Sequence, residues 1–309
     1  MGFAENIASK LMNKVGHKAV DKIKEHHDNA QHHFTKNVTC SNIEDKNAEL
    51  PPLKIQIYTH NIRQETKNLA DGEKPWSIRK EGVIRSILKT TENIPTLVGL
   101  QEVKQNQLND ILDKLGSHWS FFGVGRTDGK SKGEFSPILY KKDEWELLSG
   151  KTYWLSETPD HPSKGWDAAY ERIVTVVIMK HKKLGKIVNY LNTHYDHKGK
   201  KARENSSKEI VGIMNKCKGT SFLSGDFNSE PKAEAYKTLS QYLLDTACHC
   251  QEKDGFLNTI TDFRGNGNSS IDFIWVPKGV KVLKHEILSH EYNGYLISDH
   301  RPVVCEFEI

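Results

Sequence analysis

Short apolar runs recur along the chain from residue 53 onward, and each has the length of a β-strand. They are rich in Ile, Val, Leu and aromatic residues, which strands favour. The runs expected to form strands are 53–59, 97–103, 119–124, 137–141, 172–179, 187–194, 221–224, 271–276 and 302–307.

Apolar residues at helical spacing lie between several of these runs. Ser77 is expected to cap a helix over residues 78–89, whose inward side chains would be Val83, Ile84, Ile87 and Leu88. The spacing also predicts helices over 108–115, 201–216 and 233–243. Strands and helices interleave without strict alternation, which favours two mixed sheets with helices outside them.

Residues 1–50 differ from the rest of the chain, being rich in Lys, Asn and His and poor in aromatic residues. Apolar residues spaced by four or eight positions indicate an amphipathic helix; they are Phe3, Ile7, Leu11, Val15 and Ile23. The apolar stripe is imperfect, because a spacing of four drifts around a helix of about 3.6 residues per turn. Three interpretations stay open: a helix packed on the domain, a helix that contacts a membrane surface or a partner, and a mobile leader. Pro51-Pro52 marks the expected boundary, with residues 51–309 as one folded domain.

Composition and charge narrow the class of protein. The 309 residues are 36% hydrophobic and 27% charged, which is typical of a globular chain, and the net charge is +4. This mild excess permits an anionic ligand but is far from the dense positive charge of nucleic-acid-binding domains. The longest apolar run, 173–179, is too short to cross a bilayer, so no transmembrane segment is expected.

The cysteines indicate a reducing environment. There are five, scattered along the chain, and the close group Cys248-His249-Cys250 has no second pair at zinc-ligand spacing. The N-terminus shows no apolar segment of the kind that secretory signals carry. We therefore expect ordinary thiols and an intracellular, cytoplasmic protein.

Polar side chains stand where several predicted strands end. Taken singly, each has an ordinary explanation as a helix cap, a turn or a solvated loop. The segments are Thr59-His60-Asn61, Gln101-Glu102, Asn192-Thr193-His194, Gly225-Asp226-Phe227-Asn228, Asp272 within the run 271–276, and Ser298-Asp299-His300. If the strands share a pair of sheets, these ends gather amides, carboxylates and imidazoles in one cleft.

Such an oxygen-rich set suits a hard cation. Mg²⁺ takes a few protein oxygens and keeps several waters, which leaves room for phosphate oxygens, and Mn²⁺ is the alternative ion. The motifs contain no thiolate, which argues against a zinc site. A carboxylate beside the metal can deprotonate water, and imidazoles can donate to phosphoryl oxygens.

In their order along the chain, these segments resemble the motifs of the endonuclease/exonuclease/phosphatase superfamily, the group with the DNase I-like fold. The resemblance extends over residues 53–309 and is carried by Thr59-His60-Asn61, Leu100-Gln101-Glu102-Val103, Asn192-Thr193-His194, Gly225-Asp226-Phe227-Asn228, Ile271-Asp272-Phe273-Ile274 and Ser298-Asp299-His300-Arg301-Pro302-Val303. It implies an α/β fold, a four-layer α/β/β/α sandwich of two packed mixed sheets with outer helices, and an active site at one end of the sheets.

The resemblance also implies roles on the metal side of the site. Glu102 would be the principal Mg²⁺ ligand, Asp299 a second metal-side carboxylate, and Asn61 a support for the metal network.

Other residues would act on water and phosphate. Asp226 would orient or deprotonate the attacking water, and Asn228 would help to hold water and phosphate. His300, oriented by Asp272, would bind the scissile phosphate. His194 would contact phosphate or assist the leaving group.

Two departures from the family pattern bear on the substrate. Many members have an arginine directly before the strand of Asp272, where this chain has Ser269-Ser270; Arg264 is a candidate replacement. Inositol 5-phosphatases continue their GDxN motif with an aromatic residue and an arginine, whereas Ser229 follows Asn228 here. This difference argues against a 5-phosphatase.

The expected activity is metal-dependent hydrolysis of a phosphoester, with a phosphodiester in a nucleic acid or nucleotide as the first interpretation. The main alternative is a phosphomonoesterase on a small metabolite or sugar; others are a lipid-directed phosphodiesterase and an inactive scaffold of the same fold. The partner is thus a phosphorylated substrate.

Side chains near the predicted site supply candidate substrate contacts. Arg172 could bind phosphate or form an interlayer ion pair. Trp166, with Tyr153, Trp154 and Tyr170, could stack on a base or serve packing. Lysines on either side of His194 in the sequence could follow a nucleic-acid backbone or simply be solvated; they are Lys180, Lys182, Lys183, Lys198, Lys200 and Lys201.

Overall fold

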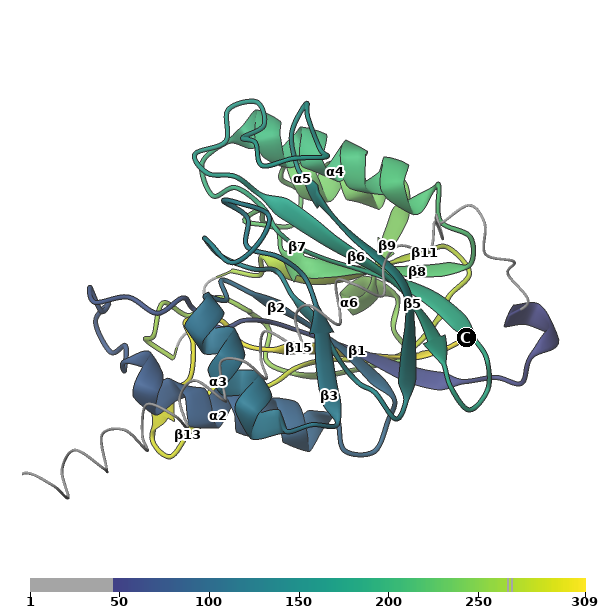
Figure 1. Cartoon of the computed structure of the whole chain (residues 1–309), viewed down its shortest axis with the longest axis horizontal. Helices are drawn as coiled ribbons and strands as arrows, with labels where there is room; N and C mark the ends of the chain where they lie inside the picture. The colour runs from purple at the N-terminus through teal and green to yellow at the C-terminus, as the bar shows by residue number, and fades with distance from the viewer. Residues whose placement is uncertain (1–46, 266, 268) are drawn as a thin grey trace, which may run out of the picture. The chain divides into compact units, whose positions relative to one another are not determined.

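Two β-sheets stack face to face and carry helices on both outer faces, as the computed structural model in Figure 1 shows. The structure describes residues 47–265, 267 and 269–309. Apart from residues 47–50, the predicted N-terminal extension lies outside the described residues. No helix among the described residues combines the length and apolarity that a membrane crossing requires.

The first sheet has the strand order β10-β12-β15-β1-β2-β4-β3. Its central strands β1 and β2 are parallel, and β15 pairs with β1 in the antiparallel sense. The strands are β1 (Lys54–Asn61), β2 (Thr96–Gln101), β3 (Trp119–Phe122), β4 (Ile138–Lys141), β10 (Glu252–Gly255), β12 (Lys281–Ile287) and β15 (Val303–Glu308).

The second sheet has the order β5-β6-β7-β8-β11-β9. Strands β7 and β8 are parallel, and the other pairs are antiparallel. The strands are β5 (Trp145–Trp154), β6 (Ile173–His181), β7 (Ile187–His194), β8 (Thr220–Asp226), β9 (Leu243–Asp245) and β11 (Asp272–Pro277).

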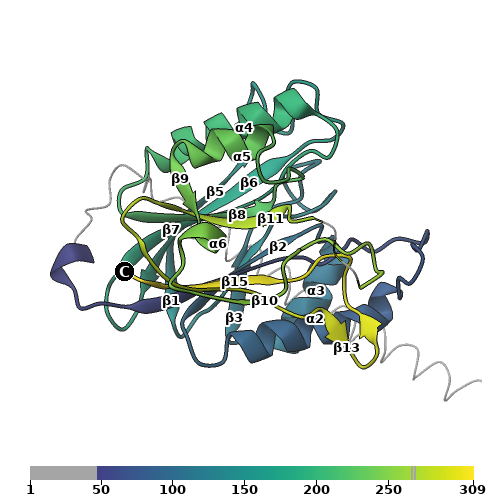
Figure 2. The same ribbon diagram turned by 180° about the vertical axis from the view of Figure 1, so that it is seen from behind.

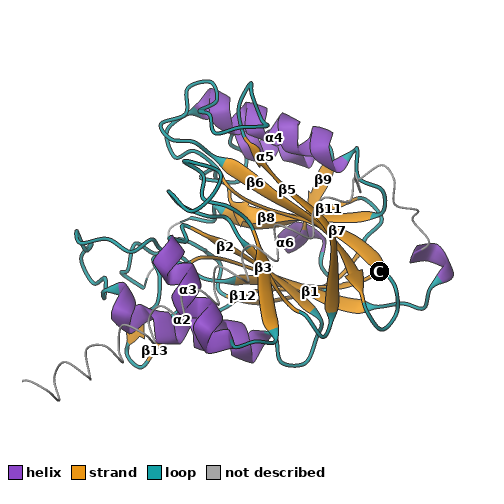
Figure 3. Cartoon of the chain, viewed as in Figure 1, coloured by secondary structure: helices purple, strands orange, loops and turns teal. Residues whose placement is uncertain are grey.

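Helices cover the outer faces, and short elements complete the chain (Figures 2 and 3). Helices α2 (Trp76–Thr90) and α3 (Gln105–Leu115) accompany the first sheet, and α4 (Lys200–Met214) and α5 (Glu234–Ser240) accompany the second. The remaining elements are the 3-10 turn η3 (Asn47–Glu49), α6 (Thr246–His249) and the hairpin β13 (Glu291–Tyr292) and β14 (Tyr295–Leu296).

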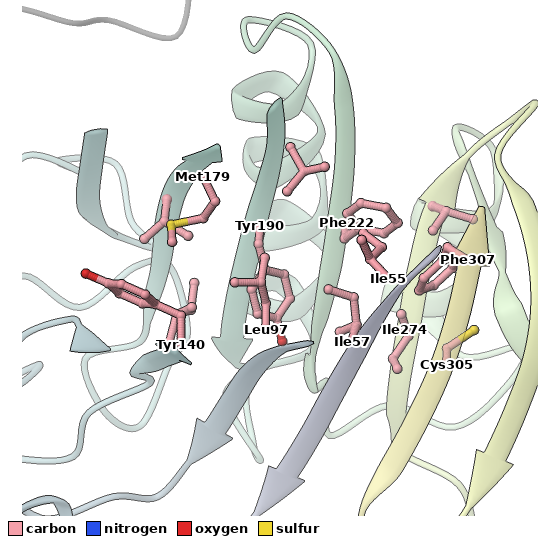
Figure 4. Packing of buried hydrophobic residues seen from close by; sticks show 14 of the residues in the cluster. Ile55, Ile57, Leu97, Tyr140, Met179, Tyr190, Phe222, Ile274, Cys305 and Phe307 are labelled. Carbon is pink, nitrogen blue, oxygen red and sulfur yellow. The ribbon is translucent and has the colours of Figure 1, made fainter. Parts of the chain in front are cut away.

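Three apolar clusters separate the layers. The cluster between the sheets includes Ile57 and Leu97 from the first sheet and Tyr190 and Phe222 from the second (Figure 4). The other two clusters lie under α2 and α3, and under α4 and α5. Burying one large apolar side chain contributes about 1.5–3 kcal/mol. The predicted four-layer α/β/β/α sandwich is thereby confirmed.

The start and inner face of helix α2 differ from the prediction. The helix begins at Trp76, so Ser77 lies in its first turn and is not the cap; the Pro75 carbonyl accepts hydrogen bonds from the first turn instead. Leu88 is 42% exposed, and the helix buries Trp76 and Arg79 in its place. The fixed backbone of a proline suits the start of a helix, and burial of the tryptophan sets the rotation.

Strands β5 and β12 were not predicted, and both contain a bulge. The register shifts between Leu147 and Ser149 in β5 and between Val282 and Lys284 in β12. A bulge inserts one residue and so breaks the alternation that reveals a strand. The predicted helix over 233–243 was also too long, because Leu243 opens β9.

Candidate active site

Strand register brings three predicted residues together on the inner face of the second sheet. Asp226, the last residue of β8, lies opposite His194 of β7 and opposite Asp272 of β11. Matched positions on neighbouring strands point to the same side of a sheet. The intervening residues, including Phe227 and Phe273, pack into the outer apolar cluster. This alternation leaves the polar side chains facing the first sheet.

The two sheets approach closely beneath the site because residue 99 is a glycine. A Cβ atom there would lie 2.4 Å from Tyr190 Oη and 2.7 Å from the Asn192 amide. The Asn192 Nδ2 group donates to Leu100 O at 2.8 Å, and Gln101 Nε2 donates to Asn192 Oδ1 at 2.7 Å. These bonds between sheets hold the ends of β2 and β7 in a fixed relation.

Asp226 is a buried carboxylate with both oxygens positioned by amides. Asn61 Nδ2 donates to Oδ2 at 2.9 Å, and the backbone N–H of Asn228 donates to Oδ1 at 2.9 Å. Asn228 has φ = 45°, a conformation that costs free energy for residues other than glycine and is concentrated at functional sites. Its Nδ2 donates to Tyr195 O at 3.0 Å. Residue 225 must be a glycine, because a Cβ there would lie 2.0 Å from Thr193 O.

The surroundings of Asp226 raise its pKa to about 7, through burial first and then the charge of Asp272. A carboxyl group whose pKa is raised in the folded state stabilises the fold below its ordinary pKa. This stabilisation is lost as the pH rises through the folded-state value.

As the pH rises from 5 to 8, we therefore expect Asp226→Asn to become more stable relative to the wild type. The difference in unfolding free energy should change by about 1–3 kcal/mol, and each kcal/mol corresponds to roughly 2–4 °C in Tm. Calorimetry in EDTA measures the melting temperatures of both proteins at each pH. The lost acceptor for Asn61 lowers the stability of the variant at every pH, so the slope is the test. Asp71→Asn, at an exposed turn, is the control. Parallel curves for Asp226→Asn and the wild type would contradict the raised pKa.

His300 and Asp272 form a dyad. Their Nδ1 and Oδ2 atoms are 2.8 Å apart, and both side chains are buried. Burial lowers the pKa of His300, but the charge and hydrogen bond of Asp272, with the charge of Asp226, outweigh burial and raise it well above its usual range. His300 is therefore an imidazolium with its Nε2 atom 3.9 Å from Asp226 Oδ2.

The Asp226, Asp272 and His300 side chains have possible ligand atoms within 4.8 Å of one another, as a metal site would. However, a protonated imidazole cannot ligate a cation, and Nδ1 is already directed to Asp272. This group is therefore better suited to a bound anion than to a metal.

His194 stands between two carboxylates. Its Nε2 lies 3.5 Å from Asp226 Oδ2, and its Nδ1 lies 3.7 Å from Glu134 Oε2. Burial and the charges of Arg172 and Arg126 lower the pKa of His194 well below its usual value, so the ring is neutral at rest. Arg126 binds Glu134 with two hydrogen bonds, at 2.8 and 3.0 Å, and so fixes the carboxylate behind the imidazole.

The metal-side residues come from the first sheet. Asn61 ends β1, and its Nδ2 donates to Glu102 Oε1 at 3.1 Å as well as to Asp226. Gln64 N donates to Glu102 Oε2 at 2.9 Å. Glu102 has φ = 61°, which directs its carboxylate off the end of β2. Ser298 Oγ donates to Asn61 O at 2.6 Å and to Asp299 Oδ1 at 3.2 Å, which joins the loop before β15 to this group.

Charges on the metal side suit a cation. Burial raises the pKa of Glu102, but the Gln64 amide and Asn61, with the charges of His300 and Arg63, outweigh burial and lower it. Burial and the charge of Glu102 raise the pKa of Asp299 despite His300 and Arg63. These two carboxylates repel each other, and a divalent cation would relieve the repulsion. The oxygen-only donor set fits Mg²⁺ or Mn²⁺.

The predicted substrate-binding residues have different surroundings. Arg172 is buried and contacts Asp196 at 3.5 Å, so the ion-pair interpretation holds in part; among the described residues its Nη1 has no hydrogen-bond partner. Trp154 is buried and donates from Nε1 to Arg126 O at 2.7 Å, so its role is packing and it cannot stack on a base. Trp166 is half-buried with φ = 50°, and its backbone N–H donates to Glu157 Oε2. Arg264 is exposed.

The lysine group before β7 lies far from His194, although the prediction placed it beside this residue. Ile187, at the start of β7, pairs with Lys180, so the turn with Lys182 and Lys183 lies at the opposite end of β7 from His194. At about 3.3 Å per residue the separation along β7 is roughly 23 Å. Only the group that follows β7, Lys198, Lys200 and Lys201, lies at the site end of the sheet.

Glu134 and Arg126 were not predicted. Glu134 precedes β4, which runs antiparallel to β2, so it reaches the edge where β2 ends. Glu134 stands before a strand, so the pattern of polar residues that follow strands does not reveal it. The signal in the sequence is a carboxylate shortly before an apolar strand, as it is for Asp299.

Cys248 and Cys250 form no disulfide among the described residues, and neither does Cys305. The structure gives no metal-binding group that includes them within the described part of the chain.

Comparison with known proteins agrees with this geometry. The sequence pattern of the Endonuclease/Exonuclease/phosphatase family matches residues 59–300. A solved structure from Bacteroides vulgatus with the same family description is 35% identical, covers 82% of this chain and 98% of its own, and has a TM-score of 0.77. One from Bacteroides thetaiotaomicron is 30% identical over 84% and 96%, with a TM-score of 0.78. A mannosyl-6-phosphatase from the latter organism is 30% identical over 82% and 99%, with a TM-score of 0.75.

Proposed function

Because the chain belongs to the endonuclease/exonuclease/phosphatase family, we propose that it is a phosphoester hydrolase that uses water as the nucleophile. The observation that carries the proposal is the placement of Asp226. Its buried carboxylate lies 3.5 Å from His194 Nε2 and 3.9 Å from His300 Nε2. A base flanked by two imidazoles can activate water directly beside a phosphate that the imidazoles hold.

Asp226 takes the proton from water. A pKa of about 7 lets the carboxylate be ionised near neutral pH while it remains a useful base. The hydrogen bonds from Asn61 and Asn228 fix its two oxygens, so the water is held for attack in line with the leaving oxygen.

The histidines hold the phosphoryl group. His300 is charged at rest and donates from Nε2 to a phosphoryl oxygen, while Asp272 fixes its ring. Binding of a phosphate favours protonation of His194, whose Nδ1–H is then directed to Glu134 and whose Nε2–H is directed to the phosphate or the leaving oxygen. Arg172 adds positive charge beside His194.

A divalent cation, Mg²⁺ with Mn²⁺ as the alternative, would be held by Glu102 and Asp299 and would neutralise charge that develops on the phosphoryl oxygens. Asn61 orients Glu102 and links it to Asp226 through the two hydrogens of one amide.

Phosphomonoesters of small metabolites are the substrate class we favour. The net charge is only +4, and one of the two lysine groups lies far from the site. The 30% identical mannosyl-6-phosphatase supports the same class. Phosphodiesters, including nucleic-acid strands, are the second candidate, because Lys198, Lys200 and Lys201 are exposed just beyond His194.

Parallel assays with p-nitrophenyl phosphate and bis(p-nitrophenyl) phosphate test the bond type. With Mg²⁺, we expect kcat/KM for the monoester to exceed that for the diester by at least about tenfold, which corresponds to about 1.4 kcal/mol of transition-state binding. The reverse order would establish the diesterase. Failure to hydrolyse either ester, or hydrolysis that EDTA does not stop, would contradict the proposed function.

A further inference from the structure

The loop before β6 and the loop after β7 meet beside His194, and the buried carboxylate of Asp196 holds them together through hydrogen bonds. Asp196 Oδ2 accepts from the backbone N–H of Ala169 at 3.0 Å and of Tyr170 at 3.2 Å. Its Oδ1 accepts from the N–H of Lys198 and Gly199 at 2.9 and 2.8 Å. Burial raises the pKa of Asp196, but these N–H groups outweigh burial and lower it to about 2, so the group stays ionised. The loop before β6 and the loop after β7 therefore form one preorganised wall.

The wall presents an aromatic pair with hydrogen-bonding groups. Tyr170 is 51% exposed, and its ring stacks on His197 with centroids 5.8 Å apart and planes at 22°. Arg172 Nη2 donates to His197 Nδ1 at 3.3 Å, so the proton of a neutral His197 ring is on Nε2. Burial and the charge of Arg172 lower the pKa of His197, which keeps the ring neutral.

This pair borders the reaction site. The Arg126 guanidinium lies 5.3 Å from the centre of the Tyr170 ring and binds Glu134, which faces His194. His197 contacts Arg172, and the charges of Arg126, Arg172 and His197 all act on the pKa of His194. A group attached to a phosphate beside His194 would therefore meet Tyr170 and His197.

We propose that Tyr170 and His197 form a subsite for the sugar ring of a phosphorylated carbohydrate, an inference that rests on the proposed function. Because the Tyr170 ring already stacks on His197 and lies beside Arg126, the groups that the wall offers to a ligand are a phenol hydroxyl and an imidazole N–H. These hydrogen-bonding groups match the hydroxyls of a sugar. A nucleobase would need an open aromatic face.

The test compares kcat/KM for mannose 6-phosphate with that for p-nitrophenyl phosphate, using the full chain and Mg²⁺. The wild type is expected to prefer the sugar phosphate. Tyr170→Ala and His197→Ala are each expected to lower the ratio of the two constants by about 10-fold, because each removes a hydrogen-bond partner of the sugar. Tyr170→Phe, which removes only the hydroxyl, should lower the ratio less than Tyr170→Ala. Tyr242→Ala is the matched control, because Tyr242 is 52% exposed on the segment between α5 and β9 and should leave the ratio unchanged.

The possible results separate this inference from the proposed function. If the wild type hydrolyses p-nitrophenyl phosphate but not mannose 6-phosphate, or if the variants leave the ratio unchanged, the sugar subsite is wrong and the hydrolase stands. If the variants reduce hydrolysis of adenosine monophosphate and not of the sugar phosphate, the wall binds a base. If neither monoester is hydrolysed but bis(p-nitrophenyl) phosphate is, the subsite is wrong and the hydrolase is a diesterase. If none of these esters is hydrolysed, the proposed function and the subsite fall together.

Discussion

Asp226→Asn is expected to lower kcat at least about 10³-fold while the fold is kept. An asparagine has the shape of the aspartate and can still accept from the Asn228 N–H, but it cannot take a proton from water. Loss of a positioned general base costs about 10²–10⁴ in rate, and the lost contact with Asn61 adds to the cost. Initial rates of phosphate release in Mg²⁺, with circular dichroism as the check on folding, measure the effect.

Asp245→Asn is the control for Asp226→Asn. Asp245 is also a buried aspartate on the second sheet, but it caps α6 and accepts a hydrogen bond from the Tyr236 hydroxyl. Its replacement can reduce stability but should leave kcat within about threefold, as expected for a position outside the site. Comparable activity in the wild type and Asp226→Asn would remove Asp226 from the mechanism.

Glu102→Gln is expected to lower kcat/KM by about 10²–10³-fold and to raise the Mg²⁺ concentration that gives half-maximal rate. A bound cation contributes several kcal/mol of charge stabilisation, and the amide removes the negative charge that attracts it. The glutamine can still accept the Gln64 N–H at one oxygen, so the backbone at φ = 61° keeps its support. A magnesium titration of the steady-state rate is the measurement.

Glu144→Gln provides a matched control for the titration. Glu144 is a half-buried, ion-paired glutamate between β4 and β5, away from the site end of the sheets. Its replacement should leave the Mg²⁺ dependence unchanged. An unaltered titration in Glu102→Gln would place the cation elsewhere.

The sequence could predict which side chains gather at this edge of the sheets, because a strand end is visible in the sequence and strand ends meet at one edge of a sheet. His194 and Asp226 each close an apolar run, and the parallel pairing of β7 and β8 brings them into register. Asn61 and Glu102 are related in the same way, since Asn61 pairs with Gln101. The same runs predicted two mixed sheets with helices outside them, and the family resemblance implied the four-layer sandwich.

Contacts made across loops could not be predicted. Glu134 lies behind His194 only because β4 runs against β2, and Arg126 reaches it from eight positions earlier in the sequence. The hydrogen bonds of Asp196 come from backbone N–H groups, which every residue except proline carries, so the amino-acid pattern does not predict them. The lysine group before β7 was wrongly expected near the site because it is near His194 in the sequence. The full length of strand β7 separates the two in space.

The most direct test of the central claim is phosphate release from p-nitrophenyl phosphate by one preparation, followed before EDTA, after EDTA and after excess Mg²⁺, with Asp226→Asn in parallel. Hydrolysis that stops with EDTA, returns with Mg²⁺ and is absent in the variant is the predicted result. Hydrolysis that survives EDTA, or that the variant retains, would contradict a metal-dependent hydrolase in which Asp226 activates water.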